Sequence, residues 1–157
     1  MPPQLLFDIS GIDLSRIVCD QEEIRRINPH RGDMEQLNAI VHADVDLKRI
    51  VGVKEIRTDE FWVSGHIPGR PLFPGVLMIE AGAQVASFFN KKYFGWKGFM
   101  GFAGVTDVRF RAQVVPPARM YVLGLKMWER QRVINCKVQG VVNGEICFDA
   151  TITGMEM

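Results

Sequence analysis

The residues from 76 to 89 restrict the possible folds more than any other part of the chain, because a helix drawn through them is apolar nearly all round. We predict a helix over residues 75–90, in which only Glu80, Gln84 and Ser87 interrupt the apolar run. A helix of this kind is buried rather than half exposed, and it is shorter than the roughly 20 residues that span a bilayer. The rest of the chain is therefore expected to wrap around it.

The segments around this helix have the alternation that is typical of strands. Charged and apolar residues alternate from 107 to 114, which gives one core face and one charged face. Strands are also expected at residues 44–57 (with Gly52 as a bulge), 60–64 and 121–127, and a short N-terminal helix is expected within 12–27, capped by Asp20. These elements predict an α+β fold in which one long helix is set into a mostly antiparallel sheet.

A hairpin around Asn143 and Gly144 closes the chain. A three-residue loop over 142–144 brings apolar positions opposite each other, for example Val138 with Phe148. In that register Cys136 points inward and Cys147 outward, so no disulfide is expected between them.

Composition limits the remaining possibilities. The 157 residues, 47% of them apolar and 24% charged, predict a single domain over 1–157, with residues 1–30 as an N-terminal extension. No secretory signal or bilayer-spanning run is visible, and three cysteines form no metal-type spacing. A cytoplasmic protein that needs no metal and no cofactor is the expectation.

Charge is unevenly distributed along the chain. The total is +1, but residues 91–137 carry net +8 between two acidic flanks. This segment either attracts an acidic partner or forms a solvated strand face. Nucleic-acid binding is disfavoured, because no recognition motif accompanies the basic residues.

Two features indicate chemistry. Glu80, Gln84 and Ser87 lie on one stripe of the buried helix, and a buried carboxyl is costly unless it is paired or used; the alternative is that the stripe faces solvent. His66 ends a strand just before a loop rich in proline and glycine, and Gly75 opens the helix, where free N–H groups favour negative charge. A base, an oxyanion position and a carboxyl suit proton transfer.

The segment from His66 to Gln84 resembles a known family. It matches the pattern H-x-P-G-x-P-x-x-P-G-V-L-x-x-E-A-x-A-Q of the FabZ-type 3-hydroxyacyl-[acyl-carrier-protein] dehydratases, which have a hot-dog fold. Pro29-His30-Arg31 and the stretch from 103 to 117 resemble two weaker motifs of this family. The run from 32 to 36 differs from the apolar run that usually follows P-H-R.

The resemblance implies a role for each site residue. His66 is the expected catalytic base, Glu80 the catalytic acid supplied by the partner subunit, and the N–H of Gly75 the donor to the thioester oxygen, while Gln84 is expected to contact substrate. The implied reaction removes water from a 3-hydroxyacyl thioester and gives the trans-2-enoyl thioester, reversibly, in fatty acid biosynthesis. The alternative is a hot-dog protein that binds or hydrolyses acyl thioesters.

The resemblance also implies partners. An acidic acyl carrier protein is expected to be attracted by the basic segment, with six candidate residues: Arg109, Arg111, Arg119, Lys126, Arg130 and Arg132. A homodimer is the expected minimum assembly, and a trimer of dimers is compatible with the family. Two remaining histidines, His30 and His42, are interpreted as structural, and the three tryptophans as packing or interface residues.

Overall fold

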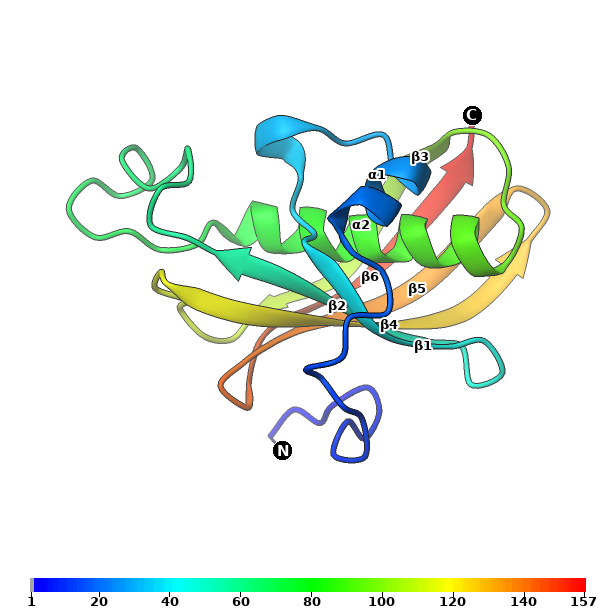
Figure 1. The fold of residues 1–157 in the computed structure, drawn as a ribbon, viewed down its shortest axis with the longest axis horizontal. Helices are drawn as coiled ribbons and strands as arrows, with labels where there is room; N and C mark the ends of the chain where they lie inside the picture. Colours follow the sequence, from blue (N-terminus) through cyan, green and yellow to red (C-terminus); the bar gives the residue numbers. More distant parts are fainter. Residues whose placement is uncertain (1) are drawn as a thin grey trace.

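A computed structural model describes residues 2–157 of the chain. Within this range the chain forms a 3-10 helix, η1 (Gly32–Met34), two α-helices, α1 (Gln21–Ile27) and α2 (Gly75–Tyr93), and six strands: β1 (Ala39–Asp44), β2 (Arg49–Ile56), β3 (Met100–Phe110), β4 (Ala118–Arg130), β5 (Val133–Val142) and β6 (Glu145–Glu156). The strands form one antiparallel sheet in the order β1-β2-β4-β5-β6-β3. The long helix α2 lies across one face of this sheet (Figure 1). The predicted α+β architecture is confirmed.

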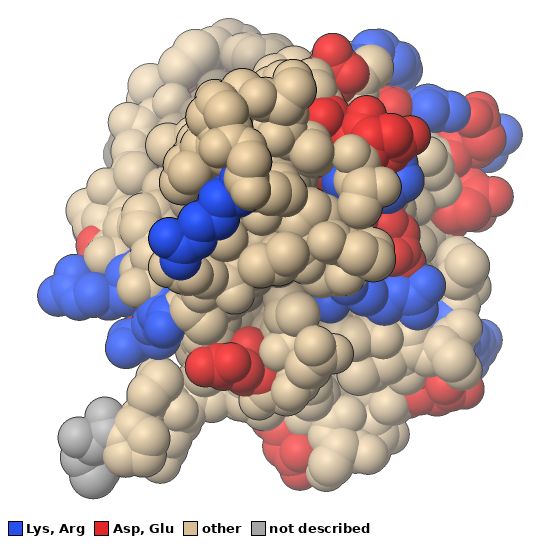
Figure 2. Space-filling model, turned by 90° about the vertical axis from the view of Figure 1, so that its left-hand side faces the viewer, with Lys and Arg blue, Asp and Glu red and all other residues tan. Residues whose placement is uncertain are grey.

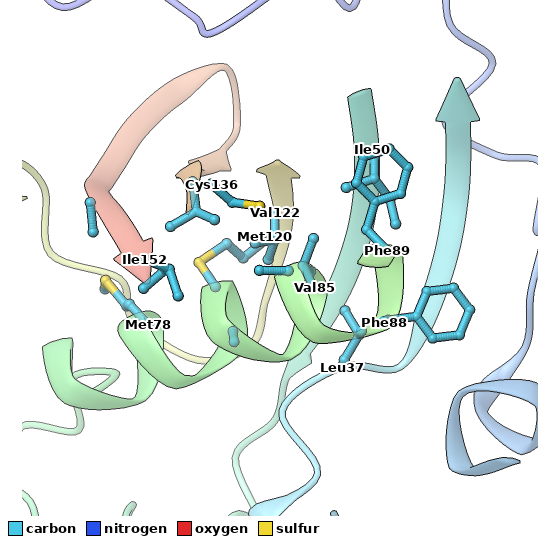
Figure 3. Packing of buried hydrophobic residues seen from close by; sticks show 14 of the residues in the cluster. Leu37, Ile50, Met78, Val85, Phe88, Phe89, Met120, Val122, Cys136 and Ile152 are labelled. Atoms are coloured by element: carbon cyan, nitrogen blue, oxygen red, sulfur yellow. The ribbon is translucent and has the colours of Figure 1, made fainter. Parts of the chain in front are cut away.

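The main core lies between α2 and the sheet. Met78, Val85, Phe88 and Phe89 of α2 are buried, and they pack among apolar residues of β2, β4, β5 and β6 (Figure 3). Helix and sheet are in close contact at Gly82, where an added Cβ would lie 2.7 Å from Val138 Cγ2. Most of the apolar side chains of this helix are therefore buried or half-buried, as its sequence predicts.

A second, smaller core lies on the opposite face of the sheet. The N-terminal segment crosses that face, and Phe7 is buried there against Val41, Val51 and Leu123 (Figure 1). The side chain of Gln139 fixes this segment, because its Oε1 accepts from Leu6 N–H at 2.9 Å and its Nε2 donates to the Gln4 carbonyl. No helix among the described residues has the length and apolar character needed to cross a bilayer.

The helix predicted within 12–27 forms only from Gln21. Asp20 caps it as expected, by accepting a hydrogen bond from Glu23 N–H. Residues before Asp20 instead pair with the edge of β1, where Cys19 and Ile40 exchange backbone hydrogen bonds. Pairing with a distant strand therefore overrides the local pattern of residues 12–19.

Two strand predictions are wrong, and the strand expected over 107–114 is right only as far as Phe110, where β3 ends. Residues 44–57 are not one strand, because the chain turns at 45–48 between β1 and β2. The bulge expected at Gly52 lies instead on the paired strand β1, where the register shifts between Ile40 and His42. Residues 60–64 form turns. Glu60 explains this, because its carboxylate accepts from Arg57 N–H and pairs with the buried Lys54, which folds the chain back on itself.

The C-terminal hairpin also differs from its prediction. A two-residue turn at Asn143 and Gly144 joins β5 to β6, and the register shifts between Gly140 and Val141. This bulge places Cys147 in the interior, 1% exposed, rather than outward. Its carbonyl accepts from Arg111 N–H, so the extra residue is held by the segment after β3. The three cysteines are nevertheless free, as expected.

Candidate functional site

The loop that carries His66 runs from the end of β2 to the start of α2 and lies at one end of the molecule (Figure 1). Trp62 and Phe73 anchor it, since both are buried and their ring centroids lie 5.5 Å apart. Phe73 N–H donates to the Val114 carbonyl. Two buried aromatic rings thus fix both arms of a loop whose tip is exposed.

His66 is held by hydrogen bonds on its ring and on its backbone. Its ring Nδ1 lies 2.8 Å from the Leu72 carbonyl oxygen, and its backbone N–H donates to the Trp62 carbonyl. A carbonyl only accepts, so Nδ1 carries a proton, and the lone pair of the neutral tautomer is then on Nε2. This is the tautomer that a general base requires. The next residue, Ile67, has φ 58°, a strained conformation for a β-branched side chain.

Gly75 begins α2, directly after Pro74, and no side chain caps this end of the helix. Its N–H makes no hydrogen bond to another residue in the range 2–157, so it is a free donor at the positive end of the helix. A Cβ at this position would lie 2.7 Å from Phe110 Cε1. A side chain at position 75 would therefore have to displace the Phe110 ring, which glycine avoids.

Glu80 lies on the second turn of α2 and lines a cavity of about 140 Å³. The cavity has a polar wall that includes His30, Ser87 and Lys91 and an apolar wall from β3, β5 and β6. The stripe that contains Glu80 therefore faces this cavity and the loop before β1, and the solvent-facing alternative is wrong. His66 does not line this cavity, so within the described residues of one subunit the two predicted catalytic side chains do not share it.

Gln84 connects the stripe to the segment before β1. Its Oε1 accepts from Gln36 N–H, and its Nε2 donates to the Met34 carbonyl and to Glu80 Oε1, at 2.7 and 2.8 Å. With its amide engaged in this way, Gln84 orients Glu80. Its predicted contact with substrate stays a prediction.

His30, expected to be structural, lies in the site. Its Nε2 is 3.4 Å from Glu80 Oε1, and it lines the same cavity. In the sequence, the resemblance of Pro29-His30-Arg31 to a family motif could have indicated that His30 belongs to the site. The folded chain adds the contact, because α1 and α2 bring residues 30 and 80 together.

The basic candidates differ in their surroundings. Arg111 pairs with Asp149 and Arg119 with Glu55, whereas Lys126 is buried, with its Nζ 3.7 Å from the Phe94 ring centroid. Lys126 is thus wrong as a docking residue. Among the described residues, Arg109 and Arg130 form no ion pair within 4.0 Å. At the end of the molecule with the His66 loop, several basic side chains lie at the left of the view, whereas acidic and basic side chains are mixed along its right-hand edge (Figure 2).

Comparisons with known proteins agree with this geometry. Residues 28–151 match the FabA-like domain family. The chain is 33% identical over 136 residues to a 3-hydroxyacyl-[acyl-carrier-protein] dehydratase FabZ of Hydrogenobaculum sp. (strain Y04AAS1), covering 85% of this chain and 91% of the relative. It is 34% identical over 137 residues to the enzyme of that name from Bacillus pumilus (strain SAFR-032), with coverages of 87% and 94%.

Solved structures support the fold. The dehydratase heterocomplex ApeI:P from Xenorhabdus doucetiae superposes with a TM-score of 0.69 at 13% identity, over 85% of this chain and 90% of that one. Cj0977, a sigma28-regulated virulence protein from Campylobacter jejuni, superposes with a TM-score of 0.66 at 16% identity, over 89% of this chain and 94% of that one. The expected hot-dog fold is confirmed by these neighbours, and on the sequence matches the chain belongs to the FabZ-type 3-hydroxyacyl-[acyl-carrier-protein] dehydratase family.

Proposed function

We propose that this protein catalyses the reversible dehydration of 3-hydroxyacyl-[acyl-carrier-protein] thioesters to trans-2-enoyl thioesters. The observation that carries the proposal is a histidine whose Nδ1 is held by a carbonyl oxygen, which leaves Nε2 to accept a proton. The carboxyl of Glu80 supports it, because it lines a cavity with one apolar wall. Membership in the FabZ-type family supports the same reaction.

The reaction divides between three groups. His66 Nε2 removes a proton from C2, and the N–H of Gly75 donates to the thioester oxygen as negative charge develops there. Glu80 donates its proton to the C3 hydroxyl as the C3–O bond breaks, so that water leaves and the C2–C3 double bond forms. The helix dipole of α2 favours the oxyanion at the same place.

A second copy of the chain completes the site. The family resemblance implies that the carboxyl of one subunit acts with the histidine of the other, and the absence of His66 from the lining of the Glu80 cavity supports this. β3 is an edge strand of the sheet, and it is long, with Phe102 and Phe110 about half exposed. An edge of this kind pairs readily with another strand, and antiparallel pairing of two β3 strands would give a two-fold symmetric dimer.

The acyl carrier protein is the proposed substrate carrier, and Arg109 is the proposed docking residue. Arg109 precedes Phe110, whose ring packs on Gly75 at the start of α2, so its charge lies near the proposed site. Charge reversal by Arg109→Glu is expected to raise KM for carrier-bound substrate but not for a small pantetheine thioester. Arg130→Glu, the same change at the opposite end of the sheet, is the matched control.

Turnover of crotonyl and 3-hydroxybutyryl thioesters, followed by enoyl absorbance, tests the reaction. His66→Ala and Glu80→Gln are each expected to lower the turnover rate by roughly 10²-fold or more, the usual contribution of a proton-transfer residue. A wild-type protein that is inactive on short and long acyl carriers alike would refute the proposal. Release of free acid and thiol would identify a thioesterase instead.

Mixed dimers test the shared site. When the two inactive variants are unfolded together and refolded, a heterodimer holds one intact site, formed by His66 of one chain and Glu80 of the other. An equimolar mixture should therefore recover about a quarter of wild-type activity, since about half of the dimers are mixed. If both groups act within one chain, mixing recovers nothing.

A further inference from the structure

His30 and Glu80 meet at the polar wall of the cavity. His30 lies in the short loop between α1 and η1, and its Nε2 is 3.4 Å from Glu80 Oε1, with the two side chains 26% and 23% exposed. Both line the same cavity, which the proposed mechanism already uses. That mechanism assigns no role to this histidine.

The two oxygens of Glu80 have different surroundings. Gln84 Nε2 donates to Oε1 at 2.8 Å, and the orientation of this amide is fixed because Gln36 N–H can only donate to Gln84 Oε1. Oε1 thus faces two nitrogen atoms, from Gln84 and His30. Oε2 receives no hydrogen bond from any residue in the range 2–157.

We propose that His30 is a positioning residue for the catalytic acid: its neutral ring, protonated on Nε2, acts with the Gln84 amide to hold Oε1 of Glu80, so that Oε2 carries the acidic proton to the substrate. The Gln84 amide donates to Oε1 at 2.8 Å, and a proton on His30 Nε2, 3.4 Å from the same atom, would add a second donor there, so that Oε1 is the carbonyl oxygen of the acid. The proton is then confined to the oxygen that is free to face the C3 hydroxyl. This inference rests on the proposed dehydratase function and extends it.

The surroundings of the ring favour this state. Burial lowers the pKa of His30 below its ordinary value, and Lys91 and Arg31 lower it further, while Glu80 and Glu35 act in the opposite direction. The ring is therefore neutral at pH 7. Its Nδ1 is buried without a partner among the described residues. A proton on Nδ1 would leave a buried N–H unpaired and turn the lone pair of Nε2 towards a carboxyl oxygen, which disfavours that tautomer.

The loop that carries His30 is held in place by hydrogen bonds. The Arg31 guanidinium donates to three backbone carbonyls, those of Arg25, Asn28 and His30. Asn28 in turn donates from Nδ2 to the Gln84 carbonyl, at 3.0 Å. The histidine is thus fixed to the same turn of α2 that carries the acid, as a preorganised site requires.

Steady-state kinetics with a conservative series test the proposal. His30→Phe keeps the ring volume but removes the donor, and it should lower kcat by roughly tenfold or more with little change in KM, which is part of the 10²- to 10⁴-fold contribution of a general acid. His30→Gln retains an N–H donor and should recover much of that loss. His42→Phe, which removes a half-buried histidine of β1, is the matched control and should leave kcat unchanged.

A double variant separates positioning from packing. In the Glu80→Gln background, His30→Phe should cause no further loss of kcat, because the group it positions is already absent. An equal loss in both backgrounds, or an unchanged kcat in His30→Phe of an active wild type, would overturn the proposal. An inactive wild type would refute the dehydratase function, and it would leave the next measurement to decide the role of His30.

Nitrogen NMR of ¹⁵N-histidine-labelled protein reports on His30 without any turnover. The chain has three histidines, so single substitutions assign every signal. His30 is expected to be neutral at pH 7, because burial lowers its pKa, and to carry its proton on Nε2. A proton on Nδ1, or a ring that is charged at pH 7, would overturn the proposal.

Discussion

The N–H of Gly75 can be removed with little disturbance of the backbone, because proline fits this position. Pro74, the preceding residue, has φ −62° and ψ 132°, the extended conformation that a residue before proline adopts. Gly75 is the first residue of α2, where proline is well tolerated and where the N–H has no partner within the helix. Gly75→Pro therefore deletes the donor that is proposed to bind the thioester oxygen.

A side chain at position 75 also displaces Phe110, and this effect needs its own control. An added Cβ would lie 2.7 Å from the Phe110 ring, which is 53% exposed and can turn away. Moving the ring out of its preferred rotamer costs on the order of 1 kcal/mol. Gly75→Ala meets the same ring but keeps its N–H, so it measures this cost alone.

The difference between the two variants isolates the hydrogen bond. We expect Gly75→Ala to lose at most about tenfold in kcat, and Gly75→Pro to lose a further 10²- to 10³-fold, the usual effect of deleting one oxyanion donor. The assay is the hydration of crotonyl thioester, with urea unfolding of each variant to establish that both are folded. Equal kcat values for the alanine and proline variants would refute the assignment of this N–H.

Three further predictions concern the framework of the site. Gly82→Ala should destabilise the protein by about 1 kcal/mol, because crowding against the buried Val138 outweighs the gain in helix propensity. In a Val138→Ala background, where this crowding is absent, the same substitution should stabilise the protein. Urea unfolding at a fixed subunit concentration measures both effects. Glu60→Ala should cost roughly 3–5 kcal/mol by the same assay, since it leaves the buried Lys54 unpaired, whereas the double variant Lys54→Met/Glu60→Leu should cost less. Burial raises the pKa of the Cys136 thiol from 9.0 to about 11, so the folded state holds its proton to higher pH than the unfolded state. The contribution of this thiol to the free energy of unfolding should fall by roughly 2 kcal/mol between pH 9 and pH 11, and Cys136→Ala should reduce the total fall by that amount.

The sequence by itself determined the central helix and the chemistry that surrounds it. An apolar run of helical length has to be buried whatever surrounds it, and α2 begins at Gly75 as predicted and ends at Tyr93, three residues beyond the predicted end. The cap at Asp20 is equally local, because its side chain reaches an N–H only three residues away. The motif from His66 to Gln84 indicated the family for the same reason, since its spacing lies within a single continuous segment.

The tertiary structure decided the features that depend on contacts between distant segments. Residues 60–64 have a strand-like sequence, but they form turns, because Glu60 pairs with the buried Lys54 of β2. The bulge that buries Cys147 depends on a hydrogen bond from Arg111.

The contact between His30 and Glu80 is the clearest case. The two residues are fifty positions apart in the sequence, and neither the periodicity nor the local spacing around either one relates it to the other. Only the packing of the loop before η1 on α2, through Asn28 and Gln84, brings the imidazole to the carboxyl. Local rules fix helices, caps and turns, whereas the partners of a buried polar group are fixed by which segments the fold places side by side.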